Sequence, residues 1–90
     1  MTMAAGKAYR AHQLSVVMAM VQGFIDDGYV IQNKYIGLTW WFWRIKHHSN
    51  GSEVTIEGLP DHNTFKIVRE GRQIKTGAIL TKPMKDGKGY

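Results

Sequence analysis

The chain has 90 residues, of which 43% are hydrophobic and 21% charged, and it contains no cysteine. That length fits a single domain over residues 1–90, and the composition argues against a disordered chain, a collagen helix or a coiled-coil rod. The lack of cysteine excludes disulfides, a thiol nucleophile and cysteine-ligated metal sites, while a net charge of +5 permits contact with a polyanion.

The composition also sets expectations about compartment and assembly. The longest apolar run, residues 16–21, is far shorter than the ~20 residues that cross a bilayer. It is not followed by an Ala-x-Ala cleavage pattern. We therefore expect a soluble, cytoplasmic protein without membrane contact. A chain of this size buries only about 60–65% of its unfolded surface, so we expect a homo-oligomer that supplements the core.

The first predicted element is a helix over residues 8–26. Its apolar side chains recur at helical spacing and form one continuous stripe. The stripe consists of Leu14, Val17, Met18, Val21, Phe24 and Ile25. Gly28 is expected to end the helix in the left-handed region. Residues 1–6 are expected to be frayed, so the predicted core spans about residues 8–81.

After the helix the apolar period changes to two, which predicts strands. A short strand is expected over residues 29–33, with Asn33-Lys34 as the turn that follows it. Residues 38–48 are rich in aromatic and β-branched side chains and strongly predict a second strand. The Asn50-Gly51 dipeptide predicts a two-residue hairpin loop. That loop places His48 opposite Glu53 in the returning strand.

This hairpin register separates two faces of the predicted sheet. Lys46 falls opposite Thr55. Arg44 falls opposite Glu57, which together with His48 and Glu53 gives two pairs of opposite charge. One face is apolar and holds Trp41, Trp43, Ile45, Val54 and Ile56. The other face holds Trp40, Phe42, Arg44, Lys46, Thr55 and Glu57. The first face is the predicted core, and the second is the candidate binding face.

A second hairpin is predicted to follow, with Glu70-Gly71 as its tight turn. It places Ile67 opposite Ile74 on the core face and Lys66 opposite Lys75 on the other face. Because proline cannot continue a central strand, Pro83 is expected to follow the end of the sheet near Thr81. Residues 82–90 are expected to form a mobile basic tail.

Together these elements predict an α+β fold. An N-terminal amphipathic helix is expected to pack on a curved antiparallel sheet of four to five strands, which runs as a meander and could close to a barrel-like shape. The helix is expected to supply Leu14, Val17, Met18, Val21 and Ile25 to the core. The sheet is expected to supply Trp41, Trp43, Ile45, Val54, Ile56, Phe65, Ile67 and Ile74.

Aromatic and cationic side chains mingle on the candidate binding face. They are Trp40, Phe42, Arg44, Lys46, Lys66 and Lys75. Single-stranded nucleic acid is held in this way, because bases stack on aromatic rings while cations follow the phosphates. We therefore predict a small, basic, non-enzymatic binding module whose partner is nucleic acid or an acidic protein surface.

The alternative function is a protein-interaction module, such as an adaptor, an inhibitor or a dimeric accessory protein. In that hypothesis Trp40 and Phe42 anchor an interface, where aromatic side chains contribute most of the binding energy. Burial of both rings against the helix, a loop or a second subunit is the structural alternative to either function.

Catalytic and metal sites find little support in the sequence. His47 and His48 are adjacent in the predicted strand, so we expect their side chains to point to opposite faces rather than to one ion. Asp26 and Asp27 close the predicted helix, where negative charge is unfavourable, so a cation of a partner could dock there. No triad spacing or phosphate-binding glycine loop occurs. We expect no catalytic residue, no metal and no cofactor.

Overall fold

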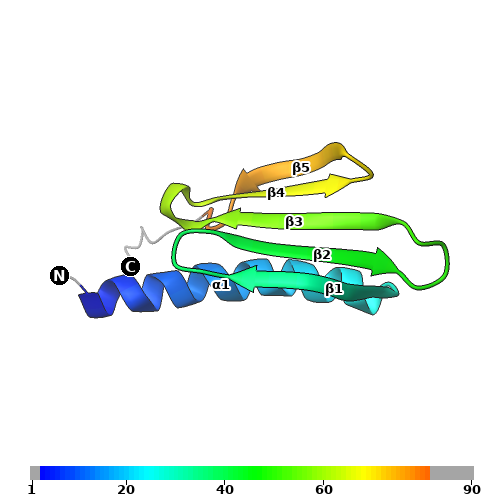
Figure 1. The fold of residues 1–90 in the computed structure, drawn as a ribbon. Helices are drawn as coiled ribbons and strands as arrows, with labels where there is room; N and C mark the ends of the chain where they lie inside the picture. The colour runs from blue at the N-terminus through cyan, green and yellow to red at the C-terminus, as the bar shows by residue number, and fades with distance from the viewer. Residues whose placement is uncertain (1–2, 82–90) are drawn as a thin grey trace.

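The computed structural model describes residues 3–81. It begins with α1 (Met3–Asp26) and continues with β1 (Tyr29–Ile36), β2 (Trp41–His47), β3 (Glu53–Leu59), the short 3-10 helix η1 (Pro60–His62), β4 (Thr64–Arg69) and β5 (Arg72–Ala78). The strands form one antiparallel sheet in the order β1-β2-β3-β4-β5, with α1 running along β1 (Figure 1). The predicted α+β fold is confirmed, and its sheet is open rather than closed into a barrel.

The two ends of α1 test the predicted helix boundaries. The helix begins at Met3, earlier than the predicted residue 8. It ends at Asp26, as predicted, and is followed by Gly28, which adopts a φ of 107° and donates its N–H to the carbonyl of Ile25 at 3.0 Å. Positive φ is inexpensive only for glycine, so this residue stops the helix and turns the chain into β1. The predicted tail over residues 82–90 lies outside the described residues.

The buried face of α1 is rotated away from the predicted stripe. Gln13 and Val17 are fully buried, whereas Met18 is 47% exposed, so its predicted place in the core is wrong. Gln13 Nε2 donates to the carbonyl oxygen of Pro60 at 3.0 Å and to Asn63 Oδ1 at 3.1 Å. These hydrogen bonds allow a polar side chain at the centre of the buried face, where apolar periodicity cannot reveal it.

The core lies between α1 and the side of the sheet that faces it, the inner face. The predicted core residues of β2 and β3 are all 2% exposed or less: Trp41, Trp43, Ile45, Val54 and Ile56. Leu14 and Ile25 are partly buried and pack against this core. The other buried apolar residues are Val17, Val21, Tyr29, Phe65, Ile67, Ile79 and Leu80.

The β2–β3 hairpin differs from its predicted register by two residues. Lys46, rather than His48, lies opposite Glu53, and every other predicted pair of this hairpin shifts with it. The loop covers residues 48–52, and within it only Gly51 adopts a positive φ, of 74°. An Asn-Gly loop of two residues, a type I′ turn, requires positive φ at both of its central positions. Because a shift of two residues preserves the alternation of side chains, the two predicted faces are nevertheless correct.

The β4–β5 hairpin has the predicted turn but not the predicted pairing. Glu70-Gly71 forms a two-residue turn with φ values of 49° and 81°. Beyond it, Ile67 pairs with Lys75, because Ile74 is the extra residue of a β-bulge. The predicted pairing of Ile67 with Ile74, and that of Lys66 with Lys75, is therefore wrong. An extra residue exchanges the faces of a strand, and Ile74 remains 47% exposed instead of joining the core.

The other edge strand, β1, also contains a bulge. Its register shifts between Ile31 and Asn33, and the strand continues to Ile36 through the predicted turn at Asn33-Lys34. Lys34 lies opposite the buried Trp43 and so belongs to the inner face. A bulge together with an inward-facing lysine discourages an edge strand from pairing with another sheet. Since β5 combines a bulge with Lys75, both edges of the sheet have this protection.

Candidate nucleic-acid interface

The face of the sheet opposite α1, the outer face, carries most of the predicted binding residues. Side chains alternate along a strand, so Phe42, Arg44 and Lys46 point away from the inner face that their β2 neighbours occupy. Arg44 and Lys46 are exposed and Phe42 is partly buried. The one α-helix of residues 3–81 lies on the inner face (Figure 1), so burial of these side chains against the helix does not occur.

Three aromatic rings form a row on the outer face. Trp40 stacks on Phe42 with ring centroids 5.5 Å apart and an interplanar angle of 25°. Tyr35, which pairs with Phe42 across β1 and β2, lies 5.4 Å from Trp40 at 36°. Tyr35 and Trp40 are 54% and 38% exposed. Exposed clusters of apolar rings usually mark a contact surface, so this row is a candidate platform for a ligand.

Cationic side chains continue from the aromatic row along β2. Arg44 lies between Asn33 of β1 and Thr55 of β3, both uncharged. Neither β1 nor β2 contains an aspartate or a glutamate, so the positive charge of Arg44 is not offset on these strands. Five residues define this surface, the β1–β2 strip: Tyr35, Trp40, Phe42, Arg44 and Lys46.

The carboxylates of the outer face lie beyond the β1–β2 strip. Glu53 of β3 and Glu70 of the β4–β5 turn line a hollow of about 340 Å³, and the Glu53 N–H donates to Glu70 Oε2 at 2.7 Å. Glu53 lies opposite Lys46 of the strip, and Glu57 lies opposite Lys66 of β4. Arg44 has uncharged residues on both neighbouring strands, so an anionic ligand is expected to contact Arg44.

Glu57 connects the strip to Lys66. Its Oε2 accepts a hydrogen bond from Trp40 Nε1, which fixes the orientation of that ring. Its Oε1 lies 3.7 Å from Lys66 Nζ. Both charged side chains are partly exposed to solvent, so this ion pair contributes little stability. It does place a carboxylate beside Lys66, which makes Lys66 a weaker phosphate ligand than Arg44.

Two groups of side chains considered from the sequence lie elsewhere. Lys75 is on the inner face, so it does not belong to this site. His47 and His48 do not point to opposite faces as predicted, because β2 ends at His47 and strand alternation does not extend beyond it. Their rings stack with centroids 5.1 Å apart. His47 Nε2 lies 2.9 Å from the carbonyl oxygen of Asp27, and its Nδ1 accepts the N–H of Ser49.

Tyr35 is the site residue that the sequence did not identify. The predicted turn at Asn33-Lys34 ended the strand too early and left Tyr35 outside the sheet. The signal was nevertheless present, since β-branched and aromatic residues stand on both sides of the polar centre of residues 29–36: Tyr29, Val30, Ile31, Tyr35 and Ile36.

Comparison with known proteins supplies no relative: no protein-family model, no curated protein and no solved structure matches the chain. Within residues 3–81, no helix combines the length and the apolar character required to cross a bilayer. In the same part of the chain, no three histidine, aspartate or glutamate side chains gather as metal ligands. Function is therefore inferred from the geometry of the site.

Proposed function

We propose that the protein is a small non-enzymatic module that binds single-stranded nucleic acid on the β1–β2 strip. The observation that supports this most directly is the row of Tyr35, Trp40 and Phe42 on an open sheet face, next to Arg44 and Lys46. Aromatic rings on a sheet face stack unpaired bases, at about 1–3 kcal/mol per base, while neighbouring cations contact the phosphates.

The chemistry of the strip favours a single strand over a duplex. Stacking requires an accessible base face, which a duplex keeps inside its own stack. Because every base has such a face, we expect little preference for sequence. The lack of cysteine fits a reducing compartment, and we propose that the protein acts in the cytoplasm and as a homo-oligomer.

An acidic protein surface is the alternative partner. Tryptophan and arginine are the residues that most often dominate protein interfaces, and Trp40 and Arg44 lie on the same strip. The two partners differ in the expected effect of salt, because phosphate contacts release counterions and bind more weakly as salt rises. A protein interface centred on Trp40 has a smaller dependence on salt.

The proposal can be tested by fluorescence anisotropy of a labelled single-stranded oligonucleotide titrated with the full chain. We expect Trp40→Ala to raise the dissociation constant about tenfold or more, which corresponds to the loss of one stacked base. Arg44→Glu is expected to weaken binding to a similar extent. Arg72→Glu makes the same reversal of charge at an exposed position of β5, at the opposite edge of the sheet from the strip, and should change binding by no more than about twofold.

Two results would count against nucleic acid as the ligand. One is the absence of binding by the unmodified chain at low salt. The other is binding that Arg44→Glu and Arg72→Glu weaken equally, because both lower the net charge by the same amount and an equal effect reports net charge rather than contact with the strip. Either result would favour the alternative that the strip binds a protein. Capture of protein partners, with Trp40→Ala as the negative control, would then test that alternative.

A further inference from the structure

The helix covers only part of the inner face of the sheet. Five strands about 4.8 Å apart span roughly 19 Å, whereas a helix with its side chains is about 10–12 Å across. Because α1 runs along β1 (Figure 1), the inner face of β5 is left uncovered beside the C-terminal half of the helix, whereas Phe65 and Ile67 of β4 remain buried. A groove of about 410 Å³ lies there, and we call it the inner groove.

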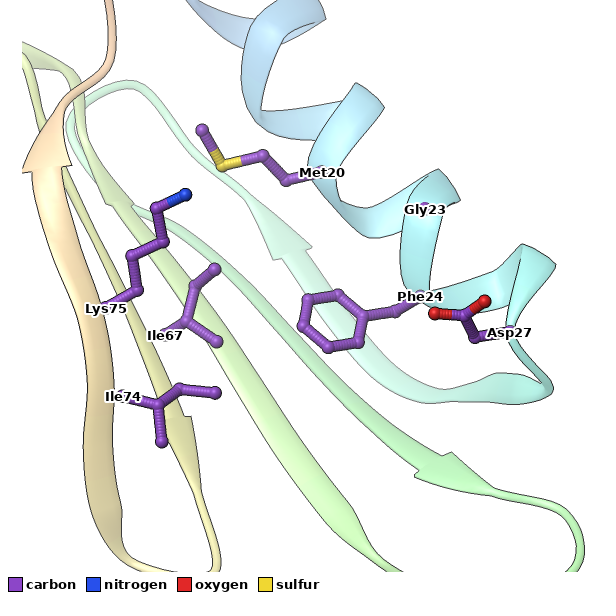
Figure 2. A pocket seen from close by; sticks show the side chains of 7 residues that line it. All are labelled: Met20, Gly23, Phe24, Asp27, Ile67, Ile74 and Lys75. Atoms are coloured by element: carbon purple, nitrogen blue, oxygen red, sulfur yellow. The ribbon is translucent and has the colours of Figure 1, made fainter.

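The walls of the inner groove are apolar. Met20 and Phe24 of α1 face Ile67 of β4 and Ile74 of β5 across it (Figure 2). Ile74 lines the groove from the edge strand β5, and it is 47% exposed. An exposed isoleucine in an apolar groove is a favourable contact for a second apolar surface.

The two ends of the inner groove carry opposite charges. Lys75 of β5 extends its ammonium group at one end, and Asp27 lies at the other, beyond the C-terminus of α1 (Figure 2). The two ion pairs formed among residues 3–81 involve neither side chain. The last turn of α1 contains no basic residue, and His47 Nε2 contacts the carbonyl oxygen of Asp27 rather than its carboxylate, so the Asp27 carboxylate stands without a lysine or arginine next to the negative end of the helix dipole.

We propose that the inner groove is a self-association surface, occupied by the same groove of a second copy of this chain. A two-fold axis through the centre of the groove would place Lys75 opposite the partner's Asp27 at two equivalent contacts. A surface with opposite charges at its ends and apolar side chains between them is complementary to itself under such an axis. The same arrangement would cover Ile74 and provide the cation that Asp27 lacks.

Two features of the fold favour this arrangement over other modes of assembly. Pairing of sheet edges is disfavoured, because β1 and β5 both combine a bulge with an inward-facing lysine. Pairing through the inner grooves leaves the outer face of each copy free. The dimer is therefore independent of the proposed nucleic-acid site and can be tested separately.

The test is the dissociation constant of the dimer, measured by sedimentation velocity on the full chain. We expect a species of twice the 10.2 kDa monomer mass. Lys75→Glu and Asp27→Lys each place like charges opposite one another at both contacts, and each should raise the dissociation constant at least tenfold or so. Lys7→Glu is the matched control and should leave it unchanged.

Mixing the two charge-reversal variants gives the most specific result. In a mixed dimer, the carboxylate introduced by K75E meets the ammonium group introduced by D27K, while the other contact retains its original Lys75 and Asp27. The mixture should therefore recover the dissociation constant of the unmodified chain, although each variant alone dimerises about tenfold more weakly or worse. Far-UV circular dichroism of each variant shows whether it has folded.

Three results would overturn the proposal. The first is a monomer at every concentration of the unmodified chain. The second is a dimer that neither charge reversal weakens. The third is a dimer that both variants weaken but that mixing does not restore, because this pairing of the two grooves requires Lys75 to meet the partner's Asp27.

Discussion

Replacement of Asn63 by alanine is expected to lower the free energy of unfolding by about 3–4 kcal/mol. Asn63 follows η1 in the left-handed region, with φ 55° and ψ 39°. Its Oδ1 accepts hydrogen bonds from Gln13 Nε2 and from the N–H of Leu80, both at 3.1 Å. Its Nδ2 donates to the carbonyl of Leu80 at 3.0 Å. One side chain thus joins the helix, η1 and the segment after β5.

The magnitude follows from what each partner loses. Each hydrogen bond contributes about 1 kcal/mol net, and a buried group left without a partner costs about 1–3 kcal/mol. Gln13 keeps the Pro60 carbonyl as an acceptor, whereas Leu80, which is 9% exposed, loses the partners of its N–H and carbonyl. Alanine in the left-handed region costs about another 1 kcal/mol that asparagine largely avoids.

Urea unfolding followed by tryptophan fluorescence measures this loss. Asn63→Gly removes the same hydrogen bonds but tolerates the backbone conformation, so it should be about 1 kcal/mol more stable than Asn63→Ala. Asn50→Ala removes a single exposed hydrogen bond, from the N–H of Ser52, and should cost less than about 1 kcal/mol. An Asn63→Ala variant no less stable than Asn50→Ala would refute the role given to Asn63.

Two further predictions concern packing, and both use the same urea assay. Gly58→Ala should destabilise the protein by about 1–3 kcal/mol, because a Cβ there would lie 2.9 Å from Cε3 of the buried Trp41 ring. Gly6→Ala, where a Cβ meets nothing within 4 Å, is the control, and an equal loss in both variants would contradict the close approach. Val17→Lys should prevent stable folding, because it buries an unpaired charge, while Met18→Lys should stay within about 0.5 kcal/mol of the unmodified chain. A stable Val17→Lys variant would show that the buried face of α1 has been assigned incorrectly.

The alternation of apolar and polar residues was sufficient to predict the two faces of the central strands. Trp41, Trp43 and Ile45 are buried, and Arg44 and Lys46 are exposed, as their spacing indicated. The loop between β2 and β3 was predicted too short. That error did not exchange the faces, because a shift of two residues preserves them.

The edge strands were harder to predict, because a bulge leaves no clear signal in one sequence. The extra residue at Ile74 brings Lys75 to the inner face, contrary to the prediction that it accompanies Lys66. The missed continuation of β1 excluded Tyr35 from the predicted site. In each case one residue of register decides which face a side chain occupies.

The buried face of α1 was also only partly predictable. Apolar spacing placed Val17 correctly but assigned Met18 to the core. The centre of the buried face is instead Gln13, whose burial depends on acceptors at Pro60 and Asn63. Hydrogen bonds between residues this distant in the chain exist only in the folded structure, so local periodicity cannot indicate them.

The measurement that tests the proposed site most directly is quenching of tryptophan fluorescence by an unlabelled single-stranded oligonucleotide at two salt concentrations. Trp41 and Trp43 are at most 2% exposed, so Trp40 is the tryptophan that a stacked base can reach. We expect quenching at low salt. If Arg44 and Lys46 each neutralise one phosphate, the logarithm of the binding constant should fall with a slope of about −1.4, which is about sevenfold for a fourfold rise in salt. Absence of quenching at low salt, or quenching that salt does not weaken, would contradict a nucleic-acid site on the β1–β2 strip.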